Sequence, residues 1–477
     1  MRTNVARGSL LGMLGQGWHL LTAFALYAFL ARRLGPAAFG QWRLVISVLV
    51  WFELFINSGL IKVATKSITE APTDRPRLAR ASYLGQAITA TVVFIGLEAL
   101  AGPIAALLGR SDLATLLRIA ALDIPLYGAF MVASAVVLGE ERFERQAVAW
   151  IIYATAKFVA IAALVAGGFS LPGALVGNAL SSVVGFAAVF APLGRREGSA
   201  AETASLSRVL LIAAVPFLAL SLTEGLGQSA DLWLVSAVVP SATLVGLYAS
   251  ATVLAEVPTF LFQGLQRVIF PSVARAAADK DERLAGHYAM QGVRLALIVC
   301  VFIVAVVAST GRQLLGLVYS DAYAGAFVPL VLLMVAAAGR TVRATCSEVL
   351  MARERRRAAL TVMIGVLVLE VALLVVLAPR YGLPGAAAGV AAAAVIGGVW
   401  SVLLVGRQIG TRPLATLARA GVAAAVVGAA LVYLTPAAPL WLLLAYPLAG
   451  AGYAVLLFVT REIGPDDIVS LRGAFGR

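Results

Sequence analysis

The feature that most constrains this chain is a succession of apolar segments, each about 20 residues long, separated by short charged or Pro/Gly-marked breaks. An α-helix needs about 20 mainly apolar residues to cross roughly 30 Å of hydrocarbon. Fourteen segments have that length, and they begin near residues 9, 40, 82, 114, 148, 172, 209, 241, 291, 325, 358, 383, 414 and 440. The sequence therefore predicts an all-α integral membrane protein with about 14 transmembrane helices.

The composition agrees with lipid as the solvent and argues against a soluble domain. Hydrophobic residues make up 61% of the chain and charged residues only 13%, against roughly 45–50% and 25% in soluble domains. The net charge of +13 would indicate nucleic acid binding in a soluble protein. Here most of the basic residues lie between the apolar segments, so no nucleic acid partner is needed to explain them.

The side on which the basic residues gather predicts the orientation. If the N-terminus is cytoplasmic, most of the 37 Lys and Arg residues fall on the cytoplasmic side. The opposite side keeps Arg32, Arg33, Arg43, Arg110, Arg118, Arg312 and Arg380. Because cytoplasmic loops carry the excess of Lys and Arg, we expect both termini in the cytoplasm.

Metal and disulfide chemistry has few candidate residues. The two cysteines, Cys300 and Cys346, both lie inside apolar segments, so they form no disulfide framework or CxxC site. The two histidines, His19 and His287, have no clustered acidic or thiol partners, and we expect them to pack or to sit at an interface. We therefore predict no metal site and no cofactor, and a proton or sodium gradient is the expected energy source.

Self-comparison of the chain indicates an internal repeat. Leu171-Pro172-Gly173-Ala174 recurs 212 residues later as Leu383-Pro384-Gly385-Ala386, and Val137-Leu138 recurs at the same offset as Val349-Leu350. Chance identity between Ala-rich helices is the alternative for each match, but the common order of the matches favours a duplication. A repeat of six helices is even, so both copies have the same orientation in the membrane.

The repeat predicts three parts of the chain. Residues 1–200 would form an N-lobe of helices 1–6, and residues 201–410 a C-lobe of helices 7–12. Residues 411–477 would add helices 13 and 14 and a cytoplasmic tail. The substrate would lie between the two lobes.

Two segments carry a family resemblance. The first is Phe29-Leu30-Ala31-Arg32-Arg33-Leu34-Gly35-Pro36-Ala37-Ala38-Phe39-Gly40, and the second is Gly246-Leu247-Tyr248 followed by Ala255-Glu256 and Ile269-Phe270-Pro271. With the helix count, they resemble the polysaccharide (O-antigen and exopolysaccharide) flippases of the multidrug/oligosaccharidyl-lipid/polysaccharide exporter superfamily. The resemblance extends over residues 1 to about 460.

The resemblance implies a V-shaped cavity between the lobes and a location in the bacterial inner (cytoplasmic) membrane. It implies that the chain is no enzyme, but carries undecaprenyl-diphosphate-linked oligosaccharide to the outer leaflet by ion-coupled alternating access. Its expected partners are that lipid-linked substrate, the bilayer and other polysaccharide-assembly proteins. Asp231 matches an acidic position of the family's seventh helix, but the basic residues that often flank it there are absent.

Three basic residues inside spans are candidates for substrate binding. A charge at mid-bilayer costs roughly 2.5–3.5 kcal/mol on insertion scales, so such residues usually face a cavity or a partner. Lys157 lies in the middle of helix five, where it would meet a diphosphate or, alternatively, pair with a carboxylate of a neighbouring helix. Arg340 and Arg343 share a face of helix ten, and guanidinium groups bind phosphate oxygens bidentately. The alternative is that helix ten ends early and both arginines are cytoplasmic anchors.

Three acidic residues are candidates for ion coupling: Glu224 and Asp231 in a polar stripe of helix seven, and Glu53 on helix two. The stripe must face protein or water, and a desolvated carboxylate gains from binding a proton or a cation. Four further acids inside spans are expected to be paired structurally: Glu98, Asp123, Glu256 and Glu370.

Two other functions compete with lipid-linked oligosaccharide transport. A polysaccharide polymerase or ligase would need a sizeable outer loop or a convergent catalytic set, and every predicted outer loop is short. An ion-coupled multidrug antiporter of the same superfamily is the stronger alternative, because fold alone does not fix the substrate. The cationic candidates favour an anionic cargo.

Overall fold

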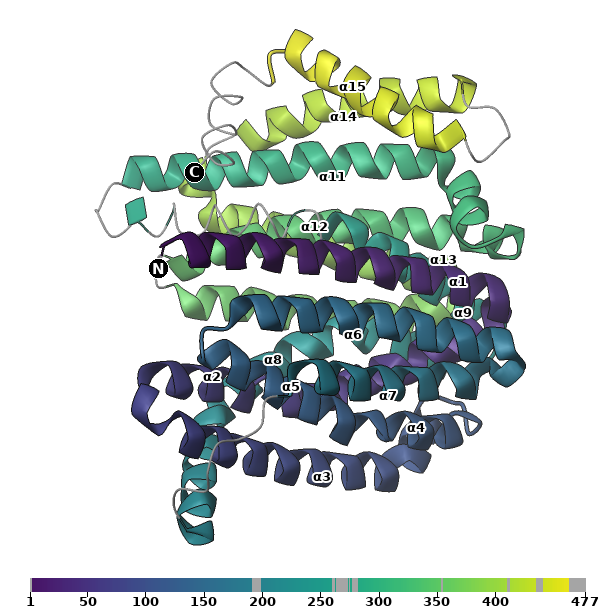
Figure 1. Cartoon of the computed structure of the whole chain (residues 1–477). Helices are drawn as coiled ribbons and strands as arrows, with labels where there is room; N and C mark the ends of the chain where they lie inside the picture. Colours follow the sequence, from purple (N-terminus) through teal and green to yellow (C-terminus); the bar gives the residue numbers. More distant parts are fainter. Residues whose placement is uncertain are drawn as a thin grey trace. The chain divides into compact units, whose positions relative to one another are not determined.

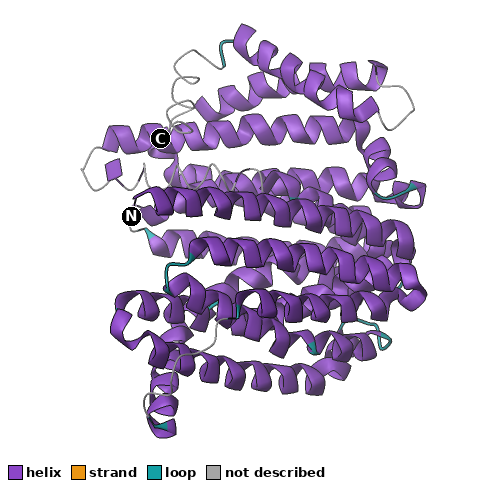
Figure 2. Ribbon diagram, viewed as in Figure 1, coloured by secondary structure: helices purple, strands orange, loops and turns teal. Residues whose placement is uncertain are grey.

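The computed structural model describes residues 2–190, 199–259, 262, 273, 275–276, 282–352, 355–409, 412–434 and 441–462. Every regular element within these residues is helical, and Figure 2 shows no strand among them. Helices satisfy the backbone hydrogen bonds within one segment, which lipid requires because it offers no partners. The all-α prediction is confirmed.

The first compact unit comprises Met1–Ala242. Its helices, seen in purple and blue in Figure 1, are α1 (Arg2–Asn57), α2 (Leu60–Glu70), α3 (Arg75–Leu107), α4 (Leu113–Ala121), α5 (Asp123–Gly139), α6 (Phe143–Leu164), α7 (Ser170–Val189) and α8 (Ala200–Val238). A 3-10 turn, η1 (Pro72–Asp74), precedes α3, and a π-helical segment, η2 (Val165–Phe169), joins α6 to α7.

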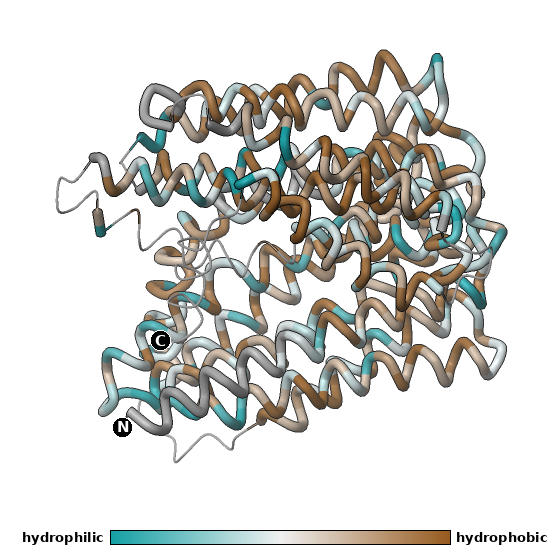
Figure 3. The backbone as a smooth tube through the Cα atoms, turned by 90° about the horizontal axis from the view of Figure 1, so that it is seen from above, coloured by the Kyte–Doolittle hydropathy of each residue, from teal (hydrophilic) through white to brown (hydrophobic). Residues whose placement is uncertain are grey.

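The second compact unit comprises Thr243–Arg477. Its helices are α9 (Ala242–Ala255), α11 (Glu282–Val318), α12 (Phe327–Ala352), α13 (Arg356–Ile409), α14 (Arg412–Leu434) and α15 (Leu442–Val459), with a 3-10 helix, η3 (Asp321–Ala326), before α12. Figure 3 shows hydrophobic stretches along the helices and hydrophilic residues mainly toward their ends.

Ten helical stretches among the described residues are long and apolar enough to cross a membrane. Three of them, Gly17–Glu70, Phe143–Val189 and Arg356–Val405, each hold two of the predicted spans. The span predicted to begin near residue 241 falls on α9 and on positions outside the described residues. The protein is therefore a multi-pass membrane protein, while the count of fourteen stays a prediction.

Glycines with positive φ divide the longest helices at the places where two spans meet. Gly35 has a φ of 73° inside α1 and is followed by Pro36, and Gly382 has a φ of 61° inside α13. Only glycine reaches this region without steric strain. At these two points the backbone is not helical, so α1 and α13 each consist of two helices that meet at a kink between consecutive predicted spans.

The internal repeat reappears in the packing of the last helix pair of each lobe. A Cβ added at Gly177 of α7 would lie 2.8 Å from the Ile161 backbone nitrogen of α6. A Cβ added at Gly389 would lie 3.2 Å from the Leu373 carbonyl carbon in the first half of α13. Gly177 and Gly389 are 212 residues apart, and so are their partners Ile161 and Leu373. The duplicated motif therefore builds the same close helix pair twice.

Helix α8 packs inside the first unit. The Trp233 indole donates a hydrogen bond to the Ser47 hydroxyl of α1 at 2.8 Å, and the Ser236 hydroxyl donates one to the Leu108 carbonyl at 3.0 Å. The sequence repeat had placed this helix at the start of the region 201–410. The first compact unit, however, extends to Ala242 and so includes α8. The lobe boundaries inferred from the repeat stay a prediction.

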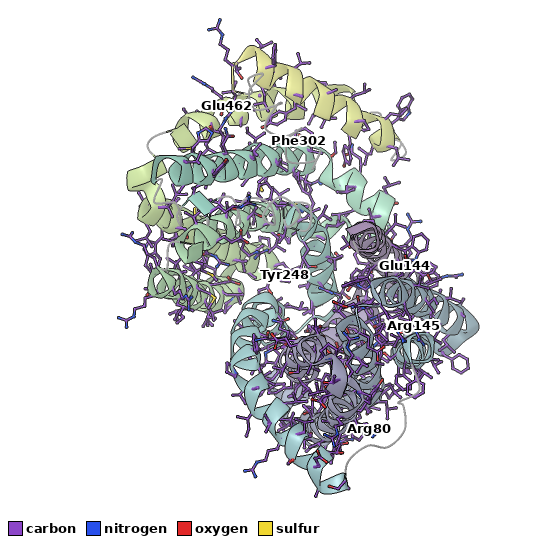
Figure 4. The ribbon with its side chains drawn as sticks, turned by 60° about the vertical axis from the view of Figure 1, so that its left-hand side comes forward. Arg80, Glu144, Arg145, Tyr248, Phe302 and Glu462 are labelled. Carbon is purple, nitrogen blue, oxygen red and sulfur yellow. The ribbon has the colours of Figure 1, made fainter. Side chains whose placement is uncertain are left out.

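The helix pair predicted after residue 411 is present as α14 and α15, both packed along α11. Its contacts with α11 include hydrogen bonds between the Thr310 and Tyr446 hydroxyls at 3.0 Å and from the Tyr453 hydroxyl to the Ile298 carbonyl at 3.0 Å. Glu462, labelled in Figure 4, lies just after the end of α15 and binds Arg294 of α11 at 2.9 Å. The pair is therefore held to α11 by contacts at three positions along that helix.

Candidate functional site

A buried carboxylate, Asp123, stands at the centre of a polar cluster in the first unit. Asp123 begins α5 and is 1% exposed. Its Oδ1 accepts a hydrogen bond from the Ser182 hydroxyl at 2.6 Å, and its Oδ2 accepts one from the Asn178 side-chain amide. Both donors lie on α7, one turn apart, so α7 presents a polar face to the start of α5.

A second buried carboxylate, Glu53 of α1, interacts electrostatically with Asp123 and with Lys157. One turn further along α1, the Asn57 side chain hydrogen-bonds the Tyr127 hydroxyl of α5. Among the described residues no donor reaches Asn57 Oδ1 or Asn178 Oδ1, although both oxygens are buried. The cluster therefore holds two carboxylates and two amide oxygens without donors, so its hydrogen-bond acceptors outnumber its donors.

Lys157 brings the only ammonium that the described contacts place in this cluster. Its Nζ lies 3.5 Å from the Tyr153 hydroxyl and 5.7 Å from the centre of that ring. It interacts electrostatically with both Glu53 and Asp123. The residue predicted to bind substrate thus lies among acids, and with both carboxylates ionised the three groups carry a net charge of about −1.

Aromatic side chains pack around the Tyr153 end of the cluster. Tyr153 stacks on Phe130 with ring centroids 4.8 Å apart, and Trp150 meets Phe130 edge-on at 5.2 Å. His19 packs edge-on against Trp150 at 6.0 Å, as expected for a packing histidine. The described residues hold no group of three or more His, Cys, Asp or Glu side chains arranged for a metal ion.

The second unit lacks this cluster at the positions related by the repeat. Adding 212 to the numbers of Asp123, Lys157, Asn178, Ser181 and Ser182 gives only apolar residues: Val335, Leu369, Val390, Ala393 and Ala394. The helices approach closely there instead, since a Cβ added at Gly339 would lie 2.6 Å from the Ala394 carbonyl oxygen. The duplicated lobes therefore differ in their buried polar chemistry.

The second unit carries a basic site of its own. Helix α12 runs without interruption to Ala352, nine residues beyond Arg343, so the helix itself does not end before Arg340. Whether the two arginines bind substrate or anchor the cytoplasmic end of the span stays a prediction. Arg343 interacts electrostatically with Arg340 and with the buried Glu370 of α13. Its Cδ lies 3.4 Å from the position of a Cβ added at Gly397, so it packs across α13.

The guanidinium of Arg343 is not fully satisfied. Its Nε is buried and finds no acceptor within the part of the chain that the structure describes. The two arginines and Glu370 together carry a net charge of about +1 on helices that are long and apolar enough to be candidate membrane spans. A buried donor without an acceptor and an excess positive charge suit an anionic group better than a further cation.

The remaining predicted residues lie elsewhere. Asp231 is buried on α8, and its Oδ1 accepts a hydrogen bond from the Leu232 backbone nitrogen at 2.7 Å. Glu224 lies on α8, but its side chain is outside the described residues. Glu98 pairs with Arg118 at 4.0 Å, as expected for a structural pair.

Sequence reasoning missed Asp123 as a member of this site. It was expected to be paired structurally, like the three other acids inside spans. The signal that could have found it is on another helix: Asn178, Ser181 and Ser182 recur at three- and four-residue spacing inside an apolar span. Such a polar stripe within a membrane needs a buried polar partner.

Comparison with protein families gives a match of residues 5–277 to the family described as polysaccharide biosynthesis protein. The match covers more than half of the chain. The chain belongs to this family. The resemblance inferred from the sequence is thereby confirmed.

A curated relative of this polysaccharide biosynthesis protein is the succinoglycan biosynthesis transport protein ExoT of Rhizobium meliloti (strain 1021). The two are 25% identical over 283 residues, which cover 56% of this chain and 54% of ExoT. The match thus spans about half the length of the curated relative.

Solved structures show the same fold. A lipid II flippase MurJ in an inward closed conformation matches with a TM-score of 0.78 at 12% identity, covering 95% of this chain and 99% of MurJ. An inward-facing multidrug resistance MATE family transporter of the MOP superfamily matches with a TM-score of 0.69 at 15% identity, covering 82% and 95%. These likenesses show the fold alone. The matched family and the curated transport protein ExoT agree with the expectation that the chain is no enzyme.

Proposed function

We propose that this polysaccharide biosynthesis transporter flips undecaprenyl-diphosphate-linked oligosaccharide from the cytoplasmic to the outer leaflet of the bacterial inner membrane. The observation that carries the proposal is the pair Arg340 and Arg343 inside a membrane span, with the buried Arg343 Nε lacking an acceptor among the described residues. A diphosphate supplies pairs of oxygens that a planar guanidinium group binds through two parallel hydrogen bonds.

The energetics favour an anionic cargo. Each arginine costs roughly 2.5–3.5 kcal/mol in a membrane span, and one buried carboxylate, Glu370, acts on Arg343. A chain that keeps two arginines against this cost gains when a dianionic headgroup binds. The polyprenyl tail remains in lipid, while the diphosphate and the sugars pass through the protein.

Ion coupling is proposed at the acidic cluster of the first unit. The sequence predicts Glu53 as a coupling residue, and Asp123 lies in the same cluster. When ionised, these two carboxylates carry two negative charges against the single positive charge of Lys157. Binding one proton or one sodium ion neutralises the three groups, which lowers the cost of burying them. We propose Glu53 and Asp123 as the coupling residues, with Lys157 as their counter-charge. Glu224 and Asp231 on α8 stay proposals from the sequence.

The orientation with both termini in the cytoplasm is supported by the distribution of Lys and Arg between the spans. The names of two similar proteins support transport of a lipid-linked or polysaccharide cargo without naming the cargo of this chain. ExoT is a transport protein of succinoglycan biosynthesis, and MurJ is a lipid II flippase. Other polysaccharide-assembly proteins are proposed partners.

The proposal is tested with the full-length protein in proteoliposomes that contain undecaprenyl-diphosphate-linked oligosaccharide. Replacing Arg340 or Arg343 by Gln removes a charged hydrogen bond worth about 1.5–3 kcal/mol, so half-saturation should rise about 10- to 100-fold. The matched control is Arg357→Gln, an exposed arginine at the start of α13, which should flip as the wild type does.

Two results would count against the proposal. If both α12 variants flip with unchanged half-saturation, the arginines do not bind the headgroup. If the wild type exports cationic drugs under an ion gradient and leaves the lipid-linked oligosaccharide in place, the protein is a multidrug antiporter. A polymerase or ligase would instead change the length or linkage of the glycan.

A further inference from the structure

Four side chains in the first unit form a continuous chain of hydrogen bonds. The Lys157 ammonium lies 3.5 Å from the Tyr153 hydroxyl. The Tyr153 hydroxyl is hydrogen-bonded to both Ser181 and Ser182, and the Ser182 hydroxyl donates to Asp123 Oδ1 at 2.6 Å. The chain therefore leads from a partly exposed ammonium to a carboxylate that is 1% exposed.

The direction of this chain follows from the number of hydrogens. An ammonium has only donors, and a serine hydroxyl has one hydrogen. Ser182 donates its hydrogen to Asp123, and Ser181 donates its own to the Asn178 backbone carbonyl. Either serine can therefore accept the hydrogen of Tyr153, while the Tyr153 oxygen accepts from Lys157. When Tyr153 donates to Ser182, every link points the same way, from Lys157 toward Asp123.

We propose that Tyr153 and Ser182 relay a proton between Lys157 and Asp123, so that the coupling ion of this transporter is a proton. The inference rests on the ion coupling proposed above for the acidic cluster and names its ion and its route. Tyr153 and Ser182 act as relay residues, and Asp123 is the buried group that holds the proton.

The proton balance of the relay is simple. Lys157 gives a proton to the Tyr153 oxygen, Tyr153 gives its own to Ser182, and Ser182 gives its own to Asp123. The outcome is a neutral amine and a neutral carboxylic acid, and no bond between heavy atoms changes. The reverse transfer restores both charges. A low dielectric favours the neutral pair and hydration favours the charged pair, so water access to the cluster drives the transfer.

The other titratable groups that act on this route are Glu53 and His19 of α1 and Tyr127 of α5. Glu53 repels the charge of Asp123, which favours the protonated acid. His19 interacts electrostatically with Lys157, and protonation of His19 would favour release of the Lys157 proton. From α7 the groups that contact Asp123 are the neutral Asn178 and Ser182.

The test is a pH jump on the purified full-length protein, with proton uptake followed by a dye in a stopped-flow instrument. Asp123→Asn should take up one proton fewer than the wild type. Tyr153→Phe keeps the ring and removes the hydroxyl, so it should take up the same number of protons at least tenfold more slowly. The matched control is Tyr446→Phe in the second unit, which removes a tyrosine hydroxyl that hydrogen-bonds Thr310 away from the route, and it should keep the wild-type rate.

Ser182 provides an independent check of the route if Tyr153→Phe does not fold. Ser182→Ala should slow the uptake, and Ser182→Thr, which keeps the hydroxyl, should restore it. Wild-type rates in both Tyr153→Phe and Ser182→Ala would overturn the relay, as would an unchanged proton count in Asp123→Asn.

Flipping under an imposed pH gradient is measured separately and distinguishes the two proposals. If flipping depends on the pH gradient but Tyr153→Phe and Ser182→Ala take up protons at the wild-type rate, only the route through Tyr153 and Ser182 is rejected. Gradient-independent flipping with slowed uptake rejects the coupling and leaves the route in place.

Discussion

Removal of the Glu462 carboxylate should loosen the attachment of α15 to its neighbours. Glu462 is 5% exposed as a side chain and binds Arg294 of α11 at 2.9 Å, Arg419 of α14 at 3.3 Å and the Thr416 hydroxyl at 2.6 Å. Arg294 also donates to the Glu462 backbone carbonyl. The three helices therefore meet on one buried carboxylate.

The magnitude follows from the exposure of each partner. Breaking a buried ion pair by removing one member costs about 3–5 kcal/mol, and the Arg294 side chain is only 18% exposed. The Arg419 pair adds roughly 0–1 kcal/mol, because its side chain is 52% exposed. Since Arg294 retains the backbone carbonyl and some water, we expect a loss of about 3 kcal/mol for Glu462→Ala.

The assay is thermal unfolding of the purified full-length protein in detergent. A loss of about 3 kcal/mol should lower the Tm by roughly 6–12 °C, at about 2–4 °C per kcal/mol for a unit of this size. Glu462→Gln keeps a hydrogen-bond acceptor and should lose less, and Arg419→Gln should change the Tm by less than about 3 °C. A Tm for Glu462→Ala within about 2 °C of the wild type would refute the reasoning.

Two further predictions concern helix packing. Gly177→Ala should lower the Tm, because its Cβ would lie 2.8 Å from Ile161 backbone atoms and overpacking costs about 1–3 kcal/mol. A Cβ added at Gly96 on α3 meets open space, so Gly96→Ala should be neutral or stabilising by about 0.5–1 kcal/mol. Equal Tm shifts in the same direction for Gly177→Ala and Gly96→Ala would contradict this prediction. Trp233→Phe removes the bond to Ser47 at 2.8 Å and should cost about 1 kcal/mol in thermal unfolding. Adding Ser47→Ala should then cost little more, and fully additive losses would show that the bond contributes nothing.

The fold was largely predictable because its signals are local or repeated. Apolar length predicts spans without knowledge of their packing, and the repeated Leu-Pro-Gly-Ala motif predicts the helix pairs at Gly177 and Gly389. The placement of α8 was not predictable, because the hydrogen bond from Trp233 to Ser47 joins residues far apart in the chain.

The candidate site was predictable only in part. A single charge in an apolar span, such as Lys157 or Glu53, is visible from its high desolvation cost. Its partners are visible only when helices are brought together, since Asp123 meets Ser182 from 59 residues away. The end of helix ten was ambiguous, because arginines suit both a helix end and a buried anion site. The continuous α12 shows that the helix extends past both arginines, and their role in binding an anion stays a prediction.

The central claim, that this transporter flips a diphosphate-linked oligosaccharide, is tested most directly by the leaflet in which that lipid accumulates when the gene is deleted. The measurement is accessibility of the glycan to an impermeant glycosidase in right-side-out and inverted membrane vesicles from the deletion strain. The account predicts that the oligosaccharide accumulates in the cytoplasmic leaflet, protected in right-side-out vesicles and cleaved in inverted ones. Normal surface polysaccharide, an unchanged leaflet distribution and a gain of drug sensitivity in the same strain would contradict it.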